Sequence, residues 1–178
     1  MDTSKAAVAR GAIEAGASIV NDVTALSGDP EMAGVVREYG AGAILMHMRG
    51  NPRVMQENPV YGDVVAEVAG RLGSRIRELS AAGIPAERLA VDPGIGFGKN
   101  LEHNLDLLRH LDEFVGLGRP VVVGLSRKSF LGKLTGKNVD QRLIPGIAAV
   151  SFAITRGAHV VRVHDVAETV DAVKVLSA

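Results

Sequence analysis

Five short apolar runs recur along the chain, and each ends in polar residues followed by a loop that contains Gly or Pro. The runs are rich in β-branched residues and apolar on both faces, which is typical of parallel strands covered by helices. They occupy residues 17–23, 41–48, 88–98, 119–129 and 158–165. The sequence therefore predicts five buried strands.

Amphipathic segments with a helical period lie between these runs. They predict helices over residues 4–15, 29–36, 64–79, 100–111, 147–154 and 166–173. Asp29 followed by Pro30 has the arrangement of an N-cap and a first helical residue, and Asn100 is a second candidate N-cap. Strands that alternate with helices predict βαβ units and hence a parallel sheet.

Two architectures agree with this alternation. A closed (β/α)₈ barrel needs eight strands and about 250 residues, whereas an open, doubly wound sheet of five strands fits the 178 residues of the chain. The pattern alone leaves both open. Two long loops, residues 48–63 and 132–142, follow the carboxyl ends of strands, where α/β proteins place ligands and mobile lids.

Composition narrows the class of function. The 20 Lys and Arg residues balance the 20 Asp and Glu residues, so no overall basic field would attract nucleic acid or an acidic membrane surface. The chain has no cysteine, which excludes disulfides, thiolate catalysis and cysteine-based metal sites within it. No apolar run reaches the ~18–20 residues of a membrane crossing, and no signal-peptide pattern is visible. We therefore expect a cytoplasmic protein without nucleic-acid or membrane partners.

Chemically useful side chains gather where the predicted strands end. The set is Asp2, Asn21, Asp22, Met46, His47, Asp92, Ser126, Arg127, Lys128, Ser129, Arg162 and His164. In a barrel, this rim is where the active site lies. Carboxylates and amides suit the N–H and C=O edges of a planar heterocycle, and Lys128 can donate to a ring carbonyl or nitrogen. Arg162 and His164 suit the oxygens of a phosphate.

Each motif also has a purely structural interpretation. Asn21 and Asp22 can cap a turn, and Asp165 can be the N-cap of the last helix beside His164. The segment DPGIGFGKN can be a glycine-rich turn, since it lacks the GxxxxGK[ST] spacing of a phosphate loop. The segment SRKS can be a solvated charge cluster. The remaining histidines are expected near the rim (His47) or at structural and surface positions (His103, His110, His159), and no pair has metal-ligand spacing.

Five stretches occur in an order that resembles the dihydropteroate synthases, the folate-pathway enzymes that sulfonamides inhibit. They are VNDV, ILMHMRGNPRVMQ, DPGIGFGK followed by Asn104, VVVGLSRKSFLG and VVRVHDV, and together they span essentially the whole chain. The resemblance implies a (β/α)₈ barrel, here an incomplete one, with residues 1–178 forming a single pterin-binding domain. It implies a transferase that joins 6-hydroxymethyl-7,8-dihydropterin diphosphate to 4-aminobenzoate and releases diphosphate. Mg²⁺ would be its cofactor, and a homodimer is compatible with the family.

The resemblance also implies roles for individual residues. Asp92 and Lys128 would be the catalytic residues. The pterin pocket would comprise Asp2, Asn21, Val23, Met46, Asp92, Gly124 and Lys128, with Val23 and Met46 against the ring. Phe97, Lys128 and Ser129 would place the aminobenzoate, while Arg162 and His164 would bind the diphosphate. Departure of diphosphate builds positive charge on the pterin, which a buried Asp92 carboxylate would stabilise.

The beginning of the chain departs from the family pattern. In that family an Asp–Thr pair closes the third strand, and here the pair Asp2–Thr3 directly follows Met1. The five predicted strands would then be the fourth to the eighth of the barrel, and the family's magnesium ligand would lie upstream, so no metal ligand is expected in this chain. We expect a fragment, or a mis-started reading frame, with negligible pteroate formation alone. The alternatives are strands supplied by another chain, or an open sheet prone to aggregation.

Two other functions agree with parts of the pattern. A pterin-dependent methyltransferase domain shares the Asp and Asn rim but has no diphosphate to bind, so SRKSFLG and RVHD argue against it. A catalytically inert remnant that binds a pterin or a partner is the second. Competition by diphosphate would separate the first from a synthase. Pterin binding without turnover, even with the upstream strands restored, would indicate the second.

Overall fold

The computed structural model describes residues 1–50 and 59–178 as parallel strands that alternate with helices. The elements are α1 (Ala6–Glu14), β1 (Ile19–Asp22), α2 (Met32–Glu38), β2 (Gly42–Met46), α3 (Val64–Ala81), β3 (Leu89–Asp92), α4 (Leu101–Arg109), α5 (Leu111–Val115), β4 (Val122–Gly124), α6 (Ser129–Thr135), α7 (Leu143–Thr155), β5 (Val160–Arg162) and α8 (Val166–Leu176). Single 3₁₀ turns cover Ala86–Arg88 and Val139–Gln141. All five predicted strands are present.

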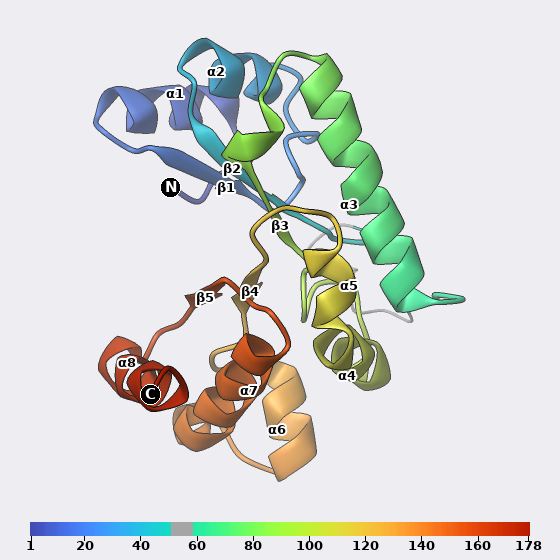
Figure 1. The fold of residues 1–178 in the computed structure, drawn as a ribbon, viewed down its shortest axis with the longest axis vertical. Coiled ribbons are helices and arrows are strands. Elements are labelled where there is room, and N and C mark those ends of the chain that lie inside the picture. The colour runs from blue at the N-terminus through green and yellow to red at the C-terminus, as the bar shows by residue number, and fades with distance from the viewer. Residues whose placement is uncertain (51–58) are drawn as a thin grey trace.

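The strands follow one another in space in the order of the sequence. β1, β2 and β3 form one parallel sheet, and β4 pairs in parallel with β5. A bridge between Val91 and Val121 joins the two sheets, and a bridge from Asp2 to Asn21 adds a short extended segment beside β1. A doubly wound sheet reverses its strand order at a switch point, and this order never reverses. The described strands are therefore an open arc of a β/α barrel, with the helices around it (Figure 1).

Helix α3 illustrates how the hydrophobic pattern becomes packing. Val68, Leu72 and Leu79 recur at helical spacing, and each is no more than 1% exposed. They belong to the same core cluster as Leu45 of β2 and Val91 of β3, so the apolar stripe of the helix covers the outer face of the sheet. Asp63 starts the helix by accepting hydrogen bonds from the backbone N–H groups of Val65 and Ala66. The predicted helix over residues 64–79 is confirmed.

Asp29 accepts a hydrogen bond in the turn that leads into the second helix, and the same carboxylate also serves the first helix. The regular part of helix α2 begins at Met32. In the turn before it, Asp29 Oδ1 accepts a hydrogen bond of 3.0 Å from the backbone N–H of Glu31, and Asp29 Oδ2 accepts one of 2.8 Å from the backbone N–H of Ala6. Ala6 is the first residue of α1, whose own N-cap position, Lys5, makes no side-chain capping bond. A carboxylate from a later unit therefore satisfies the start of an earlier helix.

Two further boundaries differ from the predictions. The helix predicted over residues 100–111 ends at Arg109, because His110 leaves the helical conformation (φ −114°, ψ 37°) and α5 starts at Leu111. The loop predicted over residues 132–142 overlaps α6, whose Phe130 and Leu131 are 2% and 3% exposed. Burial of these two side chains holds a helix too short for its period to be visible. Residues 51–58 of the predicted loop 48–63 lie outside the described residues.

No helix in the described ranges combines the length and the apolar character needed to cross a bilayer.

Candidate active site

Three of the predicted rim residues meet across the arc. Asn21 at the end of β1 donates from Nδ2 to the carboxylate of Asp2. Arg162, the last residue of β5, donates from Nη2 to the other carboxylate oxygen of Asp2 at 2.7 Å. Side chains from β1, at one end of the arc, and from β5, at the other end, thus meet at Asp2. This agrees with the prediction that the strand ends form one common rim.

Asn21 and its neighbour Asp22 have different environments. One fits the turn-capping interpretation of this pair, and the other fits the ligand-binding interpretation. Asp22 is fully buried and accepts hydrogen bonds from the backbone N–H groups of Thr24 (2.8 Å) and Leu26 (3.0 Å). It therefore shapes the turn after β1. The amide oxygen of Asn21 is buried without a hydrogen-bond partner among the described residues. An acceptor left unpaired in this way needs an N–H donor, and the rim is where a ligand would supply one.

Asp92 ends β3 between three cations. Burial raises the pKa of its carboxyl group, while the nearby charge of Lys128, the backbone N–H of Gly94 and the charges of Lys99 and Arg162 act in the opposite direction. The hydrogen bond from Gly94 N to Asp92 Oδ1 is 2.7 Å long. Burial also lowers the pKa of Lys128 to about 8, opposed by Asp92 and assisted by Arg162. The predicted pair Asp92 and Lys128 is thus electrostatically coupled in a half-buried setting.

Lys128 reaches back over the loop that follows β3. Its ammonium donates to the carbonyl of Ile95 and lies 4.9 Å from the centre of the Phe97 ring, a cation–π distance. A Cβ added at Gly124 would lie 3.9 Å from Lys128 Nζ, so Gly124 borders the same space. Lys128, Phe97 and Gly124 are therefore brought together.

The loop Pro93–Asn100 depends on glycine. Gly94 has a φ of +69° and Gly98 a φ of +63°, in the left-handed region. A Cβ at Gly94 would overlap the carbonyl oxygen of His47. Asn104, 3% exposed on α4, accepts a hydrogen bond of 2.6 Å from the backbone N–H of Gly96. The segment is a glycine-rich turn, as its structural interpretation stated, and this turn sets the positions of Asp92 and Phe97.

Lys99 is a residue of the site that the sequence analysis did not single out. It is 2% exposed, and its ammonium contacts the carbonyl of Phe97 (3.0 Å) and Nδ1 of His47 (3.2 Å). Burial lowers its pKa to about 7, with Asp92 opposing and Lys128 assisting. The lysine directly after GFG, followed by the helix cap Asn100, is the only sequence signal, and it does not reveal the burial.

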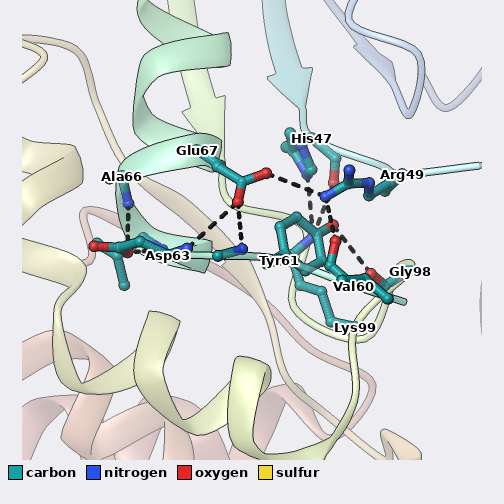
Figure 2. A network of polar contacts seen from close by, with 11 residues as sticks. His47, Arg49, Val60, Tyr61, Asp63, Ala66, Glu67, Gly98 and Lys99 are labelled. Carbon is teal, nitrogen blue, oxygen red and sulfur yellow. Dashed lines mark hydrogen bonds and ion pairs between the residues drawn. The ribbon is translucent and has the colours of Figure 1, made fainter. Parts of the chain in front are cut away.

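His47 packs against this lysine, as its predicted position near the rim implies. Burial and then the charge of Lys99 lower the pKa of His47 to about 4, so the imidazole is neutral near pH 7. Because an ammonium can only donate, Nδ1 of His47 is the acceptor. Figure 2 shows His47 and Lys99 together with Tyr61, whose hydroxyl donates to the carbonyl of Gly98 at 3.0 Å. Arg49 lies over the Tyr61 ring at 4.6 Å.

For the remaining predicted residues, the structure shows fewer contacts with the rest of the predicted site. Val23 and Met46 line one cavity of about 230 Å³, which also receives Arg71 and Arg75 of α3. His164 Nδ1 lies 3.0 Å from the hydroxyl of Ser126. No contact between described residues joins His164 to Arg162. Ser129 is the exposed first residue of α6. The ring contacts and the roles of Ser129 and His164 stay predictions.

Asp165 is the N-cap residue of α8, as predicted, but it does not cap the helix through its side chain. The carboxylate of Asp165 makes no capping bond, because it pairs with the guanidinium of Arg127. Arg127 itself has a φ of +59°, in the left-handed region that non-glycine residues rarely adopt. Within SRKS, Arg127 pairs with Asp165, whereas Lys128 donates to the carbonyl of Ile95. The segment is therefore not a simple solvated charge cluster.

The described residues offer no group of three or more His, Asp or Glu side chains placed to hold a metal ion.

The family described as pterin binding enzymes matches residues 1–164 of the chain. The chain belongs to this pterin-binding enzyme family. It is 46% identical over 178 residues to the dihydropteroate synthase of Escherichia coli K12, a match that covers 100% of this chain and 63% of that protein. The chain thus spans about 63% of the length of that relative.

Solved structures agree with this membership of the pterin-binding family. A Yersinia pestis dihydropteroate synthase, solved in a sulfonamide drug complex, superposes with a TM-score of 0.96 at 41% identity, covering 99% of this chain and 64% of that one. A Xanthomonas albilineans dihydropteroate synthase in complex with 7,8-dihydropteroate gives 0.92 at 45% identity, with coverages of 99% and 64%. The predicted family and the partial barrel are confirmed.

Proposed function

We propose that this chain carries the pterin-binding and catalytic rim of a dihydropteroate synthase, a transferase of folate biosynthesis. The observation that carries the proposal is the arrangement around Asp92, a half-buried carboxylate under the influence of the charges of Lys128 and Arg162. At the end of β1, the amide oxygen of Asn21 has no hydrogen-bond partner among the described residues. A pterin presents N–H groups on one edge and a carbonyl beside them. Acceptors at Asn21 and Asp92 and a donor at Lys128 are complementary to that edge.

The proposed reaction breaks the C–O bond between the pterin methylene and the diphosphate and forms a C–N bond to the amine of 4-aminobenzoate. The diphosphate leaves with the electron pair of the C–O bond, and the amine nitrogen loses a proton to water. Positive charge grows on the pterin as the leaving group departs. The ionised Asp92 stabilises that charge, while Arg162, assisted by His164, stabilises the departing anion.

The second substrate would sit on the other side of Lys128. The Phe97 ring, held under the Lys128 ammonium, offers a face for an aromatic amine. Lys128 and Ser129 would meet its carboxylate. The reacting carbon is strongly activated, so the amine attacks without a strong general base.

Further properties belong to the same proposal. Residues 1–178 would act as one pterin-binding domain in the cytoplasm, because a charged diphosphate ester does not cross a bilayer unaided. A homodimer is tested by the mass in solution. Magnesium, expected from the resemblance, would neutralise part of the negative charge on the diphosphate.

The test compares the chain with Asp92→Asn and with a control, Asp112→Asn, on the exposed side of α5. Calorimetry with 6-hydroxymethylpterin, with and without diphosphate, measures binding, and labelled 4-aminobenzoate measures pteroate formation. Asp92→Asn is expected to weaken pterin binding about tenfold or more, because an amide replaces one acceptor with a donor. Equal pterin affinity in Asp92→Asn would contradict the assignment.

The same measurements separate the alternative functions. Competition between inorganic diphosphate and the pterin diphosphate supports a synthase. Binding of methyltetrahydrofolate, unaffected by diphosphate, would support a methyltransferase domain instead.

A further inference from the structure

Lys99 is a buried cation to which the proposed reaction gives no part. Its ammonium is close enough to Asp92 and Lys128 for their charges to act on its pKa. It touches the carbonyl of Phe97 at 3.0 Å, and Nδ1 and the carbonyl of His47 at 3.2 and 3.4 Å. One side chain thus ties the loop after β3 to the end of β2, across 52 positions in the sequence.

The contacts of Lys99 are enclosed by the loop itself. A Cβ at Gly94 would lie 3.4 Å from Lys99 Nζ, so the backbone of that turn passes directly over the ammonium. The amide Nδ2 of Asn104 points at the carbonyl of Lys99 from α4, at 3.4 Å. Lys99 is therefore fixed from both sides, and its charge is held at a constant place relative to Asp92.

We propose that Lys99 is a positioning residue of the pterin site: it fastens the loop that carries Phe97 to β2 and holds a positive charge near Asp92. The inference rests on the proposed function, since it concerns a pterin bound by Asp92. Its first part is geometric, because the carbonyl of Phe97 is one of the ammonium's acceptors. Its second part is electrostatic, because a nearby cation favours the ionised form of a buried carboxylate.

The charged neighbours decide how this effect depends on pH. Asp92 and Lys128 face Lys99. Asp92 also faces Arg162, and His47 faces Arg49 and Arg71. The pKa of Lys99, lowered mainly by burial to about 7, means that its charge is present below neutrality and lost above it. The neutral amine still donates to the Phe97 carbonyl, so the geometric part persists at high pH while the electrostatic part disappears.

The test measures affinity for 6-hydroxymethylpterin from pH 5.5 to 8.5 in the full chain, in Lys99→Met, and in Lys99→Arg, which keeps the charge. Lys133→Met, an exposed lysine of α6, is the matched control. Lys99→Met is expected to bind on the order of tenfold more weakly at the acid end, because Asp92 then holds its proton more readily. The ratio of the pterin affinity of Lys99→Met to that of the parent should approach a constant above pH 8. Titration of the pterin itself cancels in this ratio.

The outcomes distinguish this inference from the proposed function. A ratio that is the same at every pH, or a loss equal to that of Lys133→Met, would overturn the electrostatic role of Lys99. If the parent binds no pterin at any pH, the proposed function fails. The Lys99 assignment is then judged by NMR titration alone: Lys99→Met should raise the pKa of both Asp92 and His47, and unchanged values refute it. Lys99→Gln, which keeps a donor without the charge, replaces Lys99→Met should the latter not fold.

Discussion

The guanidinium of Arg162 and the carboxylate of Asp2 are hydrogen-bonded at 2.7 Å although 160 positions separate them in the sequence. Their side chains are 67% and 52% exposed, and an ion pair of this kind contributes at most about 1 kcal/mol to stability. Its consequence is functional. Two residues that are both predicted to bind substrate are hydrogen-bonded to each other.

This pairing predicts opposite effects of one substitution on two ligands. Asp2→Asn frees Arg162 from its carboxylate, so inorganic diphosphate should bind a few-fold more tightly. The same change removes a predicted acceptor of the pterin, so 6-hydroxymethylpterin should bind more weakly. Calorimetry with each ligand measures both.

Arg162→Met provides the complementary arm of that experiment. It should weaken diphosphate binding about tenfold or more while the free energy of unfolding changes by less than about 1 kcal/mol. Arg109→Met, which breaks a similarly exposed pair with Asp106 on α4, is the control. A diphosphate affinity that falls equally in both variants would show that general charge, and not the rim, binds the anion.

The neighbours Asn21 and Asp22 should separate binding from stability. Asp22→Asn places an amide against the backbone donors of Thr24 and Leu26, and should cost about 1–3 kcal/mol in urea unfolding. Asn21→Ala removes an oxygen that has no partner among the described residues. It should change stability little and reduce pterin affinity. The reverse pattern, with Asn21→Ala the less stable variant, would contradict the division of roles.

Gly94 predicts a large cost for the smallest possible side chain. Gly94→Ala puts a Cβ into the carbonyl of His47 at a φ of +69°, so unfolding should become easier by about 3 kcal/mol or more. Gly34→Ala, in α2 with open space around the added Cβ, should instead stabilise by about 0.5–1 kcal/mol. Thermal unfolding of both variants checks the contrast, and equal melting temperatures would refute it.

Stability should rise with pH above neutrality because of the buried lysines. The pKa of Lys99 is lowered by burial from 10.5 to about 7, so between these values the unfolded chain binds more protons than the folded one. The free energy of unfolding therefore increases with pH through this window. For Lys99 the gain from pH 7 to 9 is about 2 kcal/mol, and Lys128 adds in the same direction.

Urea unfolding at pH 7 and pH 9 measures this gain. In Lys99→Met, the free energy of unfolding should increase between pH 7 and pH 9 only by the contribution of Lys128. In Lys133→Met, it should increase as much as in the parent. The test avoids the acid range, where His47, with a pKa lowered to about 4, and Asp92, with a raised pKa, act with opposite signs. If Lys99→Met gains as much as the parent, the ammonium of Lys99 is not the group that titrates.

Local signals in the sequence were sufficient for much of this fold. The period of α3 and the cap at Asn100, which accepts from the backbone N–H of His103 at 2.8 Å, involve residues a few positions apart. Residues such as Asp2, Asn21 and Asp92 followed from the rule that parallel strands end at one edge. The motif resemblance then supplied their roles.

Long-range packing decided what the sequence did not reveal. Asp29 accepts the local hydrogen bond from Glu31 that an N-cap would accept, but the sequence does not reveal its second donor, the backbone N–H of Ala6, 23 positions earlier. Lys99 is an ordinary charged residue in sequence, and it is buried because its own loop and His47, 52 positions earlier, enclose its ammonium. Asp165 stands at the predicted N-cap position, but its carboxylate pairs with Arg127, 38 positions away, and makes no capping bond.

The enclosure of Lys99 has a practical consequence. With a pKa near 7, a large share of this amine is unprotonated at neutral pH and intrinsically nucleophilic, yet at 2% exposure no reagent reaches it while the loop is closed. The rate at which Lys99 is acylated should therefore report how often the glycine-rich loop opens. This measurement needs no engineered label.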